Sequence, residues 1–232
     1  QRHGRTVRDT LETALERIAQ SSIQLVCAGR TDTGVHATAQ VAHFDTPTSR
    51  PLEAWVRGVN SHLPASIGVQ WAVEMDEAFH ARFSAISRRY RYVLLNRRVR
   101  PSLLAGRVGW VHGPLDAEAM QLAACCLVGE HDFTSFRAAE CQAKSPVRVV
   151  HSVEVVRQGE IMIFDFHANA FLHHMIRNIV GALIYVGKKR KPVEWIAELL
   201  EARDRKIAAP TFAPDGLYLC GVEYPREWPL PN

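Results

Sequence analysis

Residues 148–168 read RVVHSVEVVRQGEIMIFDFHA, and this stretch decides the fold of the second half of the chain. Two runs rich in β-branched and aromatic residues, 148–157 and 160–168, flank Gln158-Gly159, which is typical of a β-hairpin. A helix at about 172–186, a shorter helix opening at Pro192 and a strand near 217–224 are expected to follow. Strands near 88–95 and 107–112 and a helix at about 116–128, capped by Asp116, are expected to precede it. This order contains βαββαβ, the split βαβ plan.

The first half follows a related plan. A helix is expected at the start of the chain, and Thr6 and Asp9 are spaced as the capping box of its first turn. Strands are expected near 23–28 and 40–44, a helix near 52–62, and a half-buried strand at 67–75, where apolar residues alternate. The order αββαβ would match the second half if one strand preceded Gln1. We therefore predict an α+β fold with two similar lobes, residues 1–80 and 81–232, each with an antiparallel-rich sheet and helices on one face.

Composition excludes several classes of protein. The 232 residues are 47% hydrophobic, which is enough for a packed core. No apolar run is long enough to cross a bilayer, and the visible start has no signal peptide, although Gln1 need not be the natural N-terminus. The five cysteines have no C-x-x-C spacing, so we expect reduced thiols and a cytoplasmic protein.

Positive charge is concentrated in one segment. The net charge is only +4, but residues 82–107 hold eight arginines and no acidic residue. Arginines alternate there with Tyr90 and Tyr92, which indicates a strand with one basic side. A basic sheet face with aromatic side chains is typical of nucleic-acid binding. The alternative is a solvated basic face.

The sequence CAGRTDTGVHA, residues 27–37, places reactive groups directly after a strand. Arg30 and Asp32 are two residues apart, and in extended backbone such residues point the same way. Gly29 and Gly34 allow unusual backbone conformations and close approach of a ligand. This pattern predicts a reactive carboxylate at a loop tip, where functional sites concentrate. The alternative is an Asx-turn aspartate in a surface ion pair.

No cofactor motif is found. The nucleotide-binding glycine patterns, the G-x-S-x-G elbow and H-E-x-x-H are all absent from the sequence. His167, His173 and His174 lack the spacing of a metal site, so we expect structural or RNA-facing roles for them and no metal. A single carboxylate in a basic surround suggests nucleophilic or electrostatic work on an anionic substrate.

Five blocks of the sequence resemble, in order, the TruA family of tRNA pseudouridine synthases. They are CAGRTDTGVHA (27–37), FHARFSAISRRYRYVL (79–94), GEHDFTSFRA (129–138), NAFLHHMIRNIVGALIYVG (169–187) and GLYLCGVEYP (216–225). The resemblance implies two RRM-like lobes with an RNA-binding cleft between them. It also implies isomerisation of uridine to pseudouridine at positions 38 to 40 of the tRNA anticodon stem-loop, no cofactor, and a homodimer.

The resemblance also carries roles onto individual residues. It implies that Asp32 is the essential aspartate, that Arg30 pairs with it and fills the emptied base stack, and that Tyr90 packs on the target base. It leaves open whether the carboxylate attacks C6 of uracil or the sugar. The base must be flipped out of the stem at a cost of a few kcal/mol. Further substrate-binding residues are expected on the basic strand, on the helix near 172–186 and beside the pocket: Arg88, Arg89, Arg91, His173, Arg177 and Leu217.

One departure from the family concerns the first lobe. Family members have a strand before the position of Gln1, and it would lie between the strands near 40–44 and 67–75. We therefore expect a vacant slot between those two strands, or their separation, and a continuous sheet in the second half.

Two other functions remain open. A catalytically silent RNA-binding module would explain the arginines and tyrosines, but not a pocketed Arg30–Asp32 pair. A carboxylate-dependent glycosidase or nucleosidase would need a second carboxylate or metal-binding aspartates nearby and would make no use of the basic strand.

Overall fold

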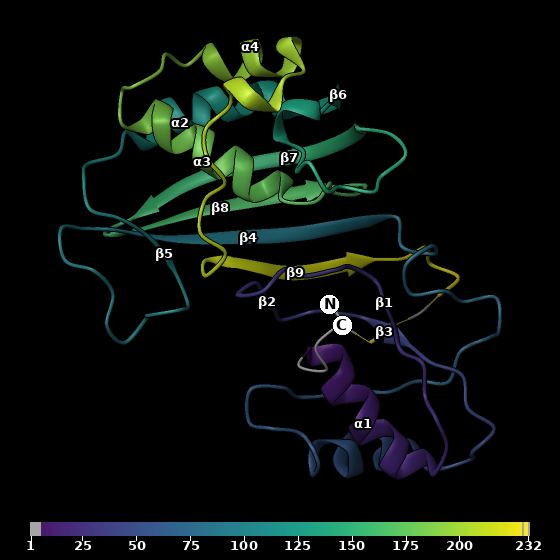
Figure 1. Cartoon of the computed structure of the whole chain (residues 1–232). Helices are drawn as coiled ribbons and strands as arrows, with labels where there is room; N and C mark the ends of the chain where they lie inside the picture. The colour runs from purple at the N-terminus through teal and green to yellow at the C-terminus, as the bar shows by residue number, and fades with distance from the viewer. Residues whose placement is uncertain (1–5, 229, 232) are drawn as a thin grey trace. The chain divides into compact units, whose positions relative to one another are not determined.

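The computed structural model describes residues 6–228 and 230–231, and the chain divides into two units (Figure 1). The smaller unit comprises residues 1–29, 41–85 and 224–232, and the larger one comprises residues 30–40 and 86–223. Residues 30–40, which the sequence placed in the first lobe, thus belong to the larger unit. The division into lobes 1–80 and 81–232 stays a prediction.

The smaller unit is built around helix α1, Val7–Ala19, which begins as the sequence predicts. The backbone N–H of Asp9 donates to Thr6 Oγ1, and the N–H of Thr6 donates to the Asp9 carboxylate, each over 3.1 Å. This capping box satisfies two N–H groups that a helix start leaves unpaired. The core of the unit is small and consists of Ala14, Leu15, Ala19, Ile23, Leu25, Trp55 and Val59.

The strands of the smaller unit are short. Strand β1, Val26–Cys27, pairs antiparallel with β3, Ala42–His43. The helix expected near 52–62 contains a π-helical turn at Ala54–Gly58. The strand predicted at 67–75 is wrong, because these residues form no ladder in the described part of the chain. Instead the side-chain amide of Asn60 bonds both the N–H and the C=O of Val69, each over 2.7 Å.

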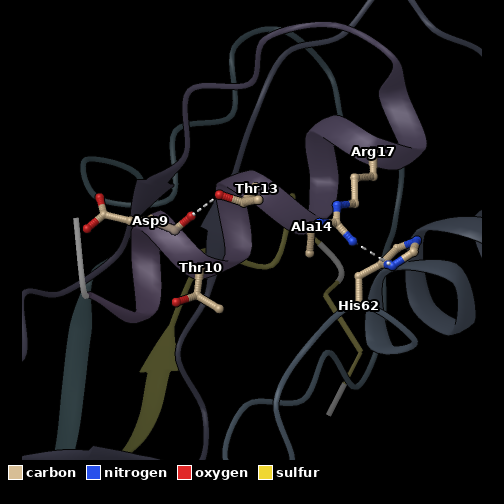
Figure 2. Close-up of a pocket in the computed structure, with 6 residues that line it drawn as sticks. All are labelled: Asp9, Thr10, Thr13, Ala14, Arg17 and His62. Carbon is tan, nitrogen blue, oxygen red and sulfur yellow. Dashed lines mark hydrogen bonds between the residues drawn. The ribbon is translucent and has the colours of Figure 1, made fainter.

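A pocket of the smaller unit lies along α1 (Figure 2). It is lined by Asp9, Thr10, Thr13, Ala14, Arg17 and His62. Thr13 Oγ1 donates to the Asp9 carbonyl over 2.9 Å, and an Arg17 Nη1 lies 3.4 Å from His62 Nδ1. These polar groups are thus already paired with the backbone of α1 or with each other. The pocket holds none of the predicted site residues.

The larger unit contains a mixed sheet in the order β2-β9-β4-β8-β7-β6, with β5 also paired to β4. Strand β7, Val147–Gln158, pairs antiparallel with β8, Ile161–Ala168, and the two form the predicted hairpin. Gly159 turns it with φ +61°, a conformation that glycine adopts without strain. Strand β4, Ser87–Asn96, pairs antiparallel with both β8 and β9, Leu217–Glu223. As expected for the second half, this run of strands is continuous.

Three short strands complete the sheet. Strand β5, Gly109–Val111, lies parallel to β4, and β6, Gly129–Asp132, lies antiparallel to β7. Strand β2, His36–Ala37, pairs in parallel with β9. The sequence predicted neither β2 nor β6, because each is too short to show a pattern of its own.

Helices cover one face of this sheet (Figure 1). They are α2, Ala117–Ala124, α3, Met175–Gly187, and α4, Trp195–Ala202. The Asp116 side chain caps α2 by accepting from the Ala119 N–H over 3.0 Å, as predicted. Alternate residues of β8, from Met162 to Ala168, pack against the helices in one core. The mixed α+β class with a mostly antiparallel sheet is confirmed, and the RRM-like description stays a prediction.

Within the described residues, no helix combines the length and the apolar character that a membrane span requires.

Candidate active site

The loop that carries Asp32 is held by the edge of the larger sheet. Its last residues form β2, and the His36 ring stacks on Tyr218 of β9 with centroids 4.7 Å apart. The loop turns where the Val35 N–H donates to the Asp32 carbonyl over 3.0 Å. Gly34 is the third residue of that turn with φ +84°, and a Cβ there would lie 2.8 Å from Pro214 Cγ. A side chain at position 34 would therefore disturb the support of Asp32.

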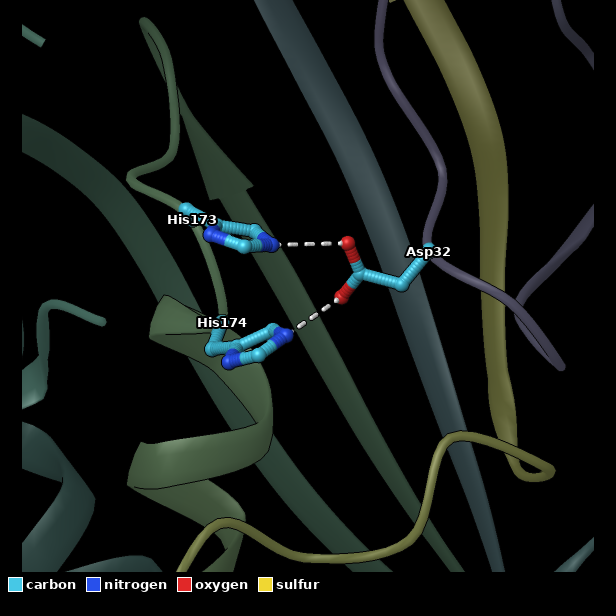
Figure 3. A group of neighbouring side chains, drawn as sticks. All are labelled: Asp32, His173 and His174. Carbon is cyan, nitrogen blue, oxygen red and sulfur yellow. Dashed lines mark hydrogen bonds and ion pairs between the residues drawn. The ribbon is translucent and has the colours of Figure 1, made fainter. Parts of the chain in front are cut away.

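The Asp32 carboxylate lies among three nitrogen-bearing side chains of one helix start (Figure 3 shows two of them). Oδ1 is 3.1 Å from His173 Nε2, and Oδ2 is 3.2 Å from His174 Nε2. Arg177 Nη1 donates to Oδ2 over 3.2 Å. The exposed fraction of each of the four side chains is a quarter or less, and that of Asp32 is 18%. The carboxylate is thus screened from solvent but reachable.

The backbone at the start of α3 explains how two consecutive histidines face one carboxylate. His174 is the N-cap of α3 and has φ +61°, a left-handed conformation that is uncommon for residues other than glycine. Helix α3 therefore begins at Met175, later than the sequence predicts. The His173 carbonyl accepts from the Ala138 N–H over 3.0 Å, which fixes the chain before the cap. Strained residues of this kind are concentrated at functional sites.

The electrostatics of this corner favour a negative charge. The N-terminus of α3 carries the positive end of the helix dipole, which stabilises a nearby carboxylate. Burial lowers the pKa of His174, and the neighbouring Asp32 partly opposes that shift by raising it. Arg177 is anchored from the other side, because its Nε donates to the Phe212 carbonyl over 2.8 Å.

The predicted pairing of Arg30 with Asp32 is wrong for the described residues. The Arg30 side chain is exposed, and the guanidinium that contacts Asp32 is that of Arg177. A role of Arg30 toward the target base stays a prediction.

The structure distinguishes the two tyrosines of the basic strand. The Tyr90 ring meets Phe171 edge-on with centroids 5.2 Å apart. Burial raises the pKa of Tyr90 to about 12, and nearby Arg88 lowers it while Asp32 raises it. Tyr92 is fully buried and donates to the Ala213 carbonyl over 2.9 Å, and burial raises its pKa too. Tyr90 therefore lies in the electrostatic field of Asp32, and Tyr92 serves the core.

The three arginines expected to bind phosphate do not share one face. Arg89 and Arg91 project from β4 on the side opposite Tyr92 and are ion-paired, Arg89 with Glu223 and Arg91 with Asp165. Arg91 makes a bidentate contact with Asp165, in which Nε donates to Oδ1 over 2.8 Å and Nη2 donates to Oδ2 over 2.9 Å. Arg88 lies on the other side and donates to the Asn169 carbonyl over 3.0 Å. Phosphate binding by these arginines stays a prediction.

Comparison with known proteins decides the family. The family model described as tRNA pseudouridine synthase matches residues 1–84 and 123–225. The tRNA pseudouridine synthase A of Aromatoleum aromaticum is 64% identical over 232 residues, which cover 100% of this chain and 88% of that protein. The tRNA pseudouridine synthase A proteins of Dechloromonas aromatica and Paraburkholderia xenovorans are 60% and 56% identical, over 99% and 100% of this chain and 87% and 86% of theirs.

The chain belongs to the tRNA pseudouridine synthase family. Pseudouridine synthases are isomerases, so the reaction moves bonds within one nucleotide and leaves its composition unchanged. The resemblance of the five sequence blocks is thereby confirmed at the level of the family.

The sequence predicts several residues of the site but not the contacts among them. His173 and Arg177 are predicted to bind the substrate, but both contact Asp32, which lies 141 and 145 residues away along the chain. No local spacing signals such a contact, and two adjacent histidines match no metal pattern. Leu217 is 6% exposed and packs in the core of the larger unit, so a place beside the pocket stays a prediction.

Proposed function

We propose that this chain converts uridine to pseudouridine in the anticodon stem-loop of tRNA, at positions 38 to 40, with Asp32 as the reactive carboxylate. One observation carries the proposal: the only aspartate of the glycine-flanked loop is held by His173, His174 and Arg177 at the start of α3. Membership of the family supplies the reaction class, and this geometry supports the choice of Asp32.

The reaction needs few groups. The N1–C1′ bond breaks, uracil turns, a C5–C1′ bond forms, and the proton on C5 leaves while N1 gains one. A carboxylate can start this by adding to C6 of the ring or by acting at C1′, as carboxylates do at glycosidic centres. Asp32 suits either route because its donors fix both oxygens. Groups fixed before the reaction need no reorganisation during it.

Removal of the C5 proton is assigned to Tyr90 acting as a relay. Its pKa of about 12 keeps the hydroxyl protonated near neutrality, so it is a poor base by itself. A protonated hydroxyl can still accept the C5 proton while it passes its own to a neighbour. Asp32, whose charge already acts on Tyr90, is the neighbour we assign to receive it.

The remaining parts of the proposal concern binding. The target base must leave the stem, and the exposed Arg30, two residues before Asp32 in the chain, is assigned to the space that it vacates. Arg88, on the same face of β4 as Tyr90, is assigned to a phosphate of the substrate. We also propose a cytoplasmic homodimer, as the family resemblance implies. The mass of the purified chain by light scattering tests the dimer.

Asp32→Asn tests the proposal directly. We expect it to abolish tritium release from tRNA labelled at C5 of uridine, because an amide cannot replace the carboxylate, while tRNA binding stays near that of the parent chain. Asp76→Asn is the matched control, since Asp76 accepts from the Ala78 N–H over 2.8 Å and an amide oxygen can do the same. It should keep both properties.

Each contrary outcome points to a defined alternative. Residual turnover near the parent level in Asp32→Asn contradicts the assignment of Asp32. Binding of tRNA by the parent chain without tritium release identifies a silent RNA-binding module. Release of free uracil identifies a nucleosidase.

A further inference from the structure

The side chains around Asp32 also have the composition of a transition-metal site. Among the described residues, Asp32, His173 and His174 form a group whose ligand atoms all lie within 4.8 Å of one another (Figure 3). Two imidazoles and one carboxylate are the ligand set of many zinc sites that keep a fourth position open. Each Nε2 atom now faces a carboxylate oxygen of Asp32, and a cation can lie between them in place of a proton.

The distances suit one ion bound by all three residues. Metal–nitrogen and metal–oxygen bonds of about 2.0–2.1 Å give a tetrahedron with edges of about 3.3 Å. The observed separations are close to that edge, 3.1 Å from His173 Nε2 to Oδ1 of Asp32 and 3.2 Å from His174 Nε2 to Oδ2. The left-handed backbone of His174 already turns both rings toward Asp32, with ring centroids 4.0 Å apart. Binding therefore needs small rotations of side chains and no change of the backbone.

The surroundings supply partners for the ligands. Metal-bound histidines commonly direct their other ring nitrogen at a carboxylate. His173 Nδ1 lies 4.0 Å from Glu140 Oε2, and the Glu140 side chain is exposed and can approach. Arg177 contacts Oδ2 of Asp32, the oxygen that His174 also faces, so it orients the carboxylate. Its positive charge opposes the cation and weakens binding.

We infer that Asp32, His173 and His174 together bind a divalent transition-metal ion such as Zn²⁺, and that the bound ion inhibits the synthase. The ion is not a cofactor, because it engages the carboxylate that the substrate needs. Binding of the ion stands on the geometry alone, whereas inhibition rests on the proposed role of Asp32. Release of the ion restores the free carboxylate, so the inhibition is reversible.

A titration of the chelator-treated full chain with ZnCl₂, followed by calorimetry, tests binding without reference to activity. We expect one strong site per chain, and CoCl₂ should give the visible absorption of a tetrahedral Co²⁺ complex. His173→Gln and His174→Gln should each weaken binding by at least about tenfold, the loss that even outer-shell changes cause. Glutamine keeps an N–H for Asp32, so the fold is little disturbed, and circular dichroism checks this.

Two further variants make the test specific. Glu140→Gln should weaken Zn²⁺ binding by roughly tenfold, because it removes the charge behind His173 without touching the ion. His112→Gln is the control for adventitious binding, since His112 is an exposed histidine that packs beside Trp110. Binding unchanged in the His173 and His174 variants, or reduced equally in His112→Gln, would overturn the site.

Activity tests the second half of the inference. Zn²⁺ should suppress tritium release, and excess chelator should restore it, whereas Mg²⁺ at equal concentration should have no such effect. Zinc bound at the site with turnover unchanged would overturn inhibition. A chain that binds zinc at these residues but never releases tritium would remove the proposed function and leave the site standing.

Discussion

At the scale of single residues, the site depends on contacts that no short motif contains. Asp32 is bonded from a helix that begins more than 140 residues later in the chain, and His174 takes a backbone conformation that its sequence neighbours do not predict. The glycine-flanked loop predicts a reactive aspartate because Gly29 and Gly34 are local signals. Its partners depend on the tertiary fold, so a guanidinium from α3 replaces the expected Arg30.

Tyr90→Phe tests the hydroxyl of the tyrosine to which the proposed function assigns the C5 proton. We predict that turnover falls by about 100-fold, the lower end of the usual contribution of a proton-transfer group, while tRNA affinity changes little because the ring remains. Because burial raises the pKa of Tyr90 to about 12, the parent pH–rate profile should show no ionisation of this group near neutrality.

Tyr92→Phe is the matched control for Tyr90→Phe. It loses one buried hydrogen bond, to the Ala213 carbonyl, and should lower the free energy of unfolding by about 1 kcal/mol with turnover retained. Turnover near the parent level in Tyr90→Phe would restrict Tyr90 to packing.

At the scale of elements, prediction succeeds where the signal is local. The hairpin of β7 and β8 is predicted because its turn and its apolar residues lie within one stretch, and α1 and α2 because their caps do. The segment 67–75 shows the limit of this reasoning. Its alternation specifies a half-buried face but no partner strand, and Asn60 takes the backbone bonds of Val69 instead.

Strand β4 gives a prediction about salt. Arg88→Gln should reduce the slope of log affinity for tRNA against log salt by roughly 0.7 to 0.9, the value for one lost phosphate contact. The double variant Arg89→Gln/Arg91→Gln should reduce the slope by less than two lost phosphate contacts would. The reason is that Glu223 and Asp165 already neutralise these two arginines. Binding isotherms across a salt series measure both. A larger change in the double variant would show that RNA displaces these ion pairs.

At the scale of the whole molecule, the two units differ in how well their backbones are paired. The larger unit has a continuous run of strands and an extensive core, whereas the smaller unit has two-residue strands and a few buried residues. Local opening is easiest where buried contacts and backbone hydrogen bonds are sparse. Residues 30–40, which carry Asp32, belong to the better-paired unit, which suits the proposed site because such a site must hold its geometry.

Hydrogen exchange of the full chain should resolve this difference. We predict slow exchange for the amides of β7 and β8 and fast exchange within residues 67–75, except at Ile67 and Val69, whose N–H groups are bonded. Mass spectrometry after partial digestion, or NMR, reads both segments in one sample. Equal protection of 67–75 and β8 would contradict the prediction.

The charge at the start of α3 also connects catalysis to protein abundance. Removing the Asp32 carboxylate leaves His173, His174 and Arg177 half-buried without their shared acceptor, and a buried donor that loses its acceptor destabilises the fold. A survey that scores variants by their level in cells would therefore record position 32 as a folding position. Only a paired measurement of level and turnover separates the two roles, because one carboxylate holds the helix start and, in the proposed function, also acts on the substrate.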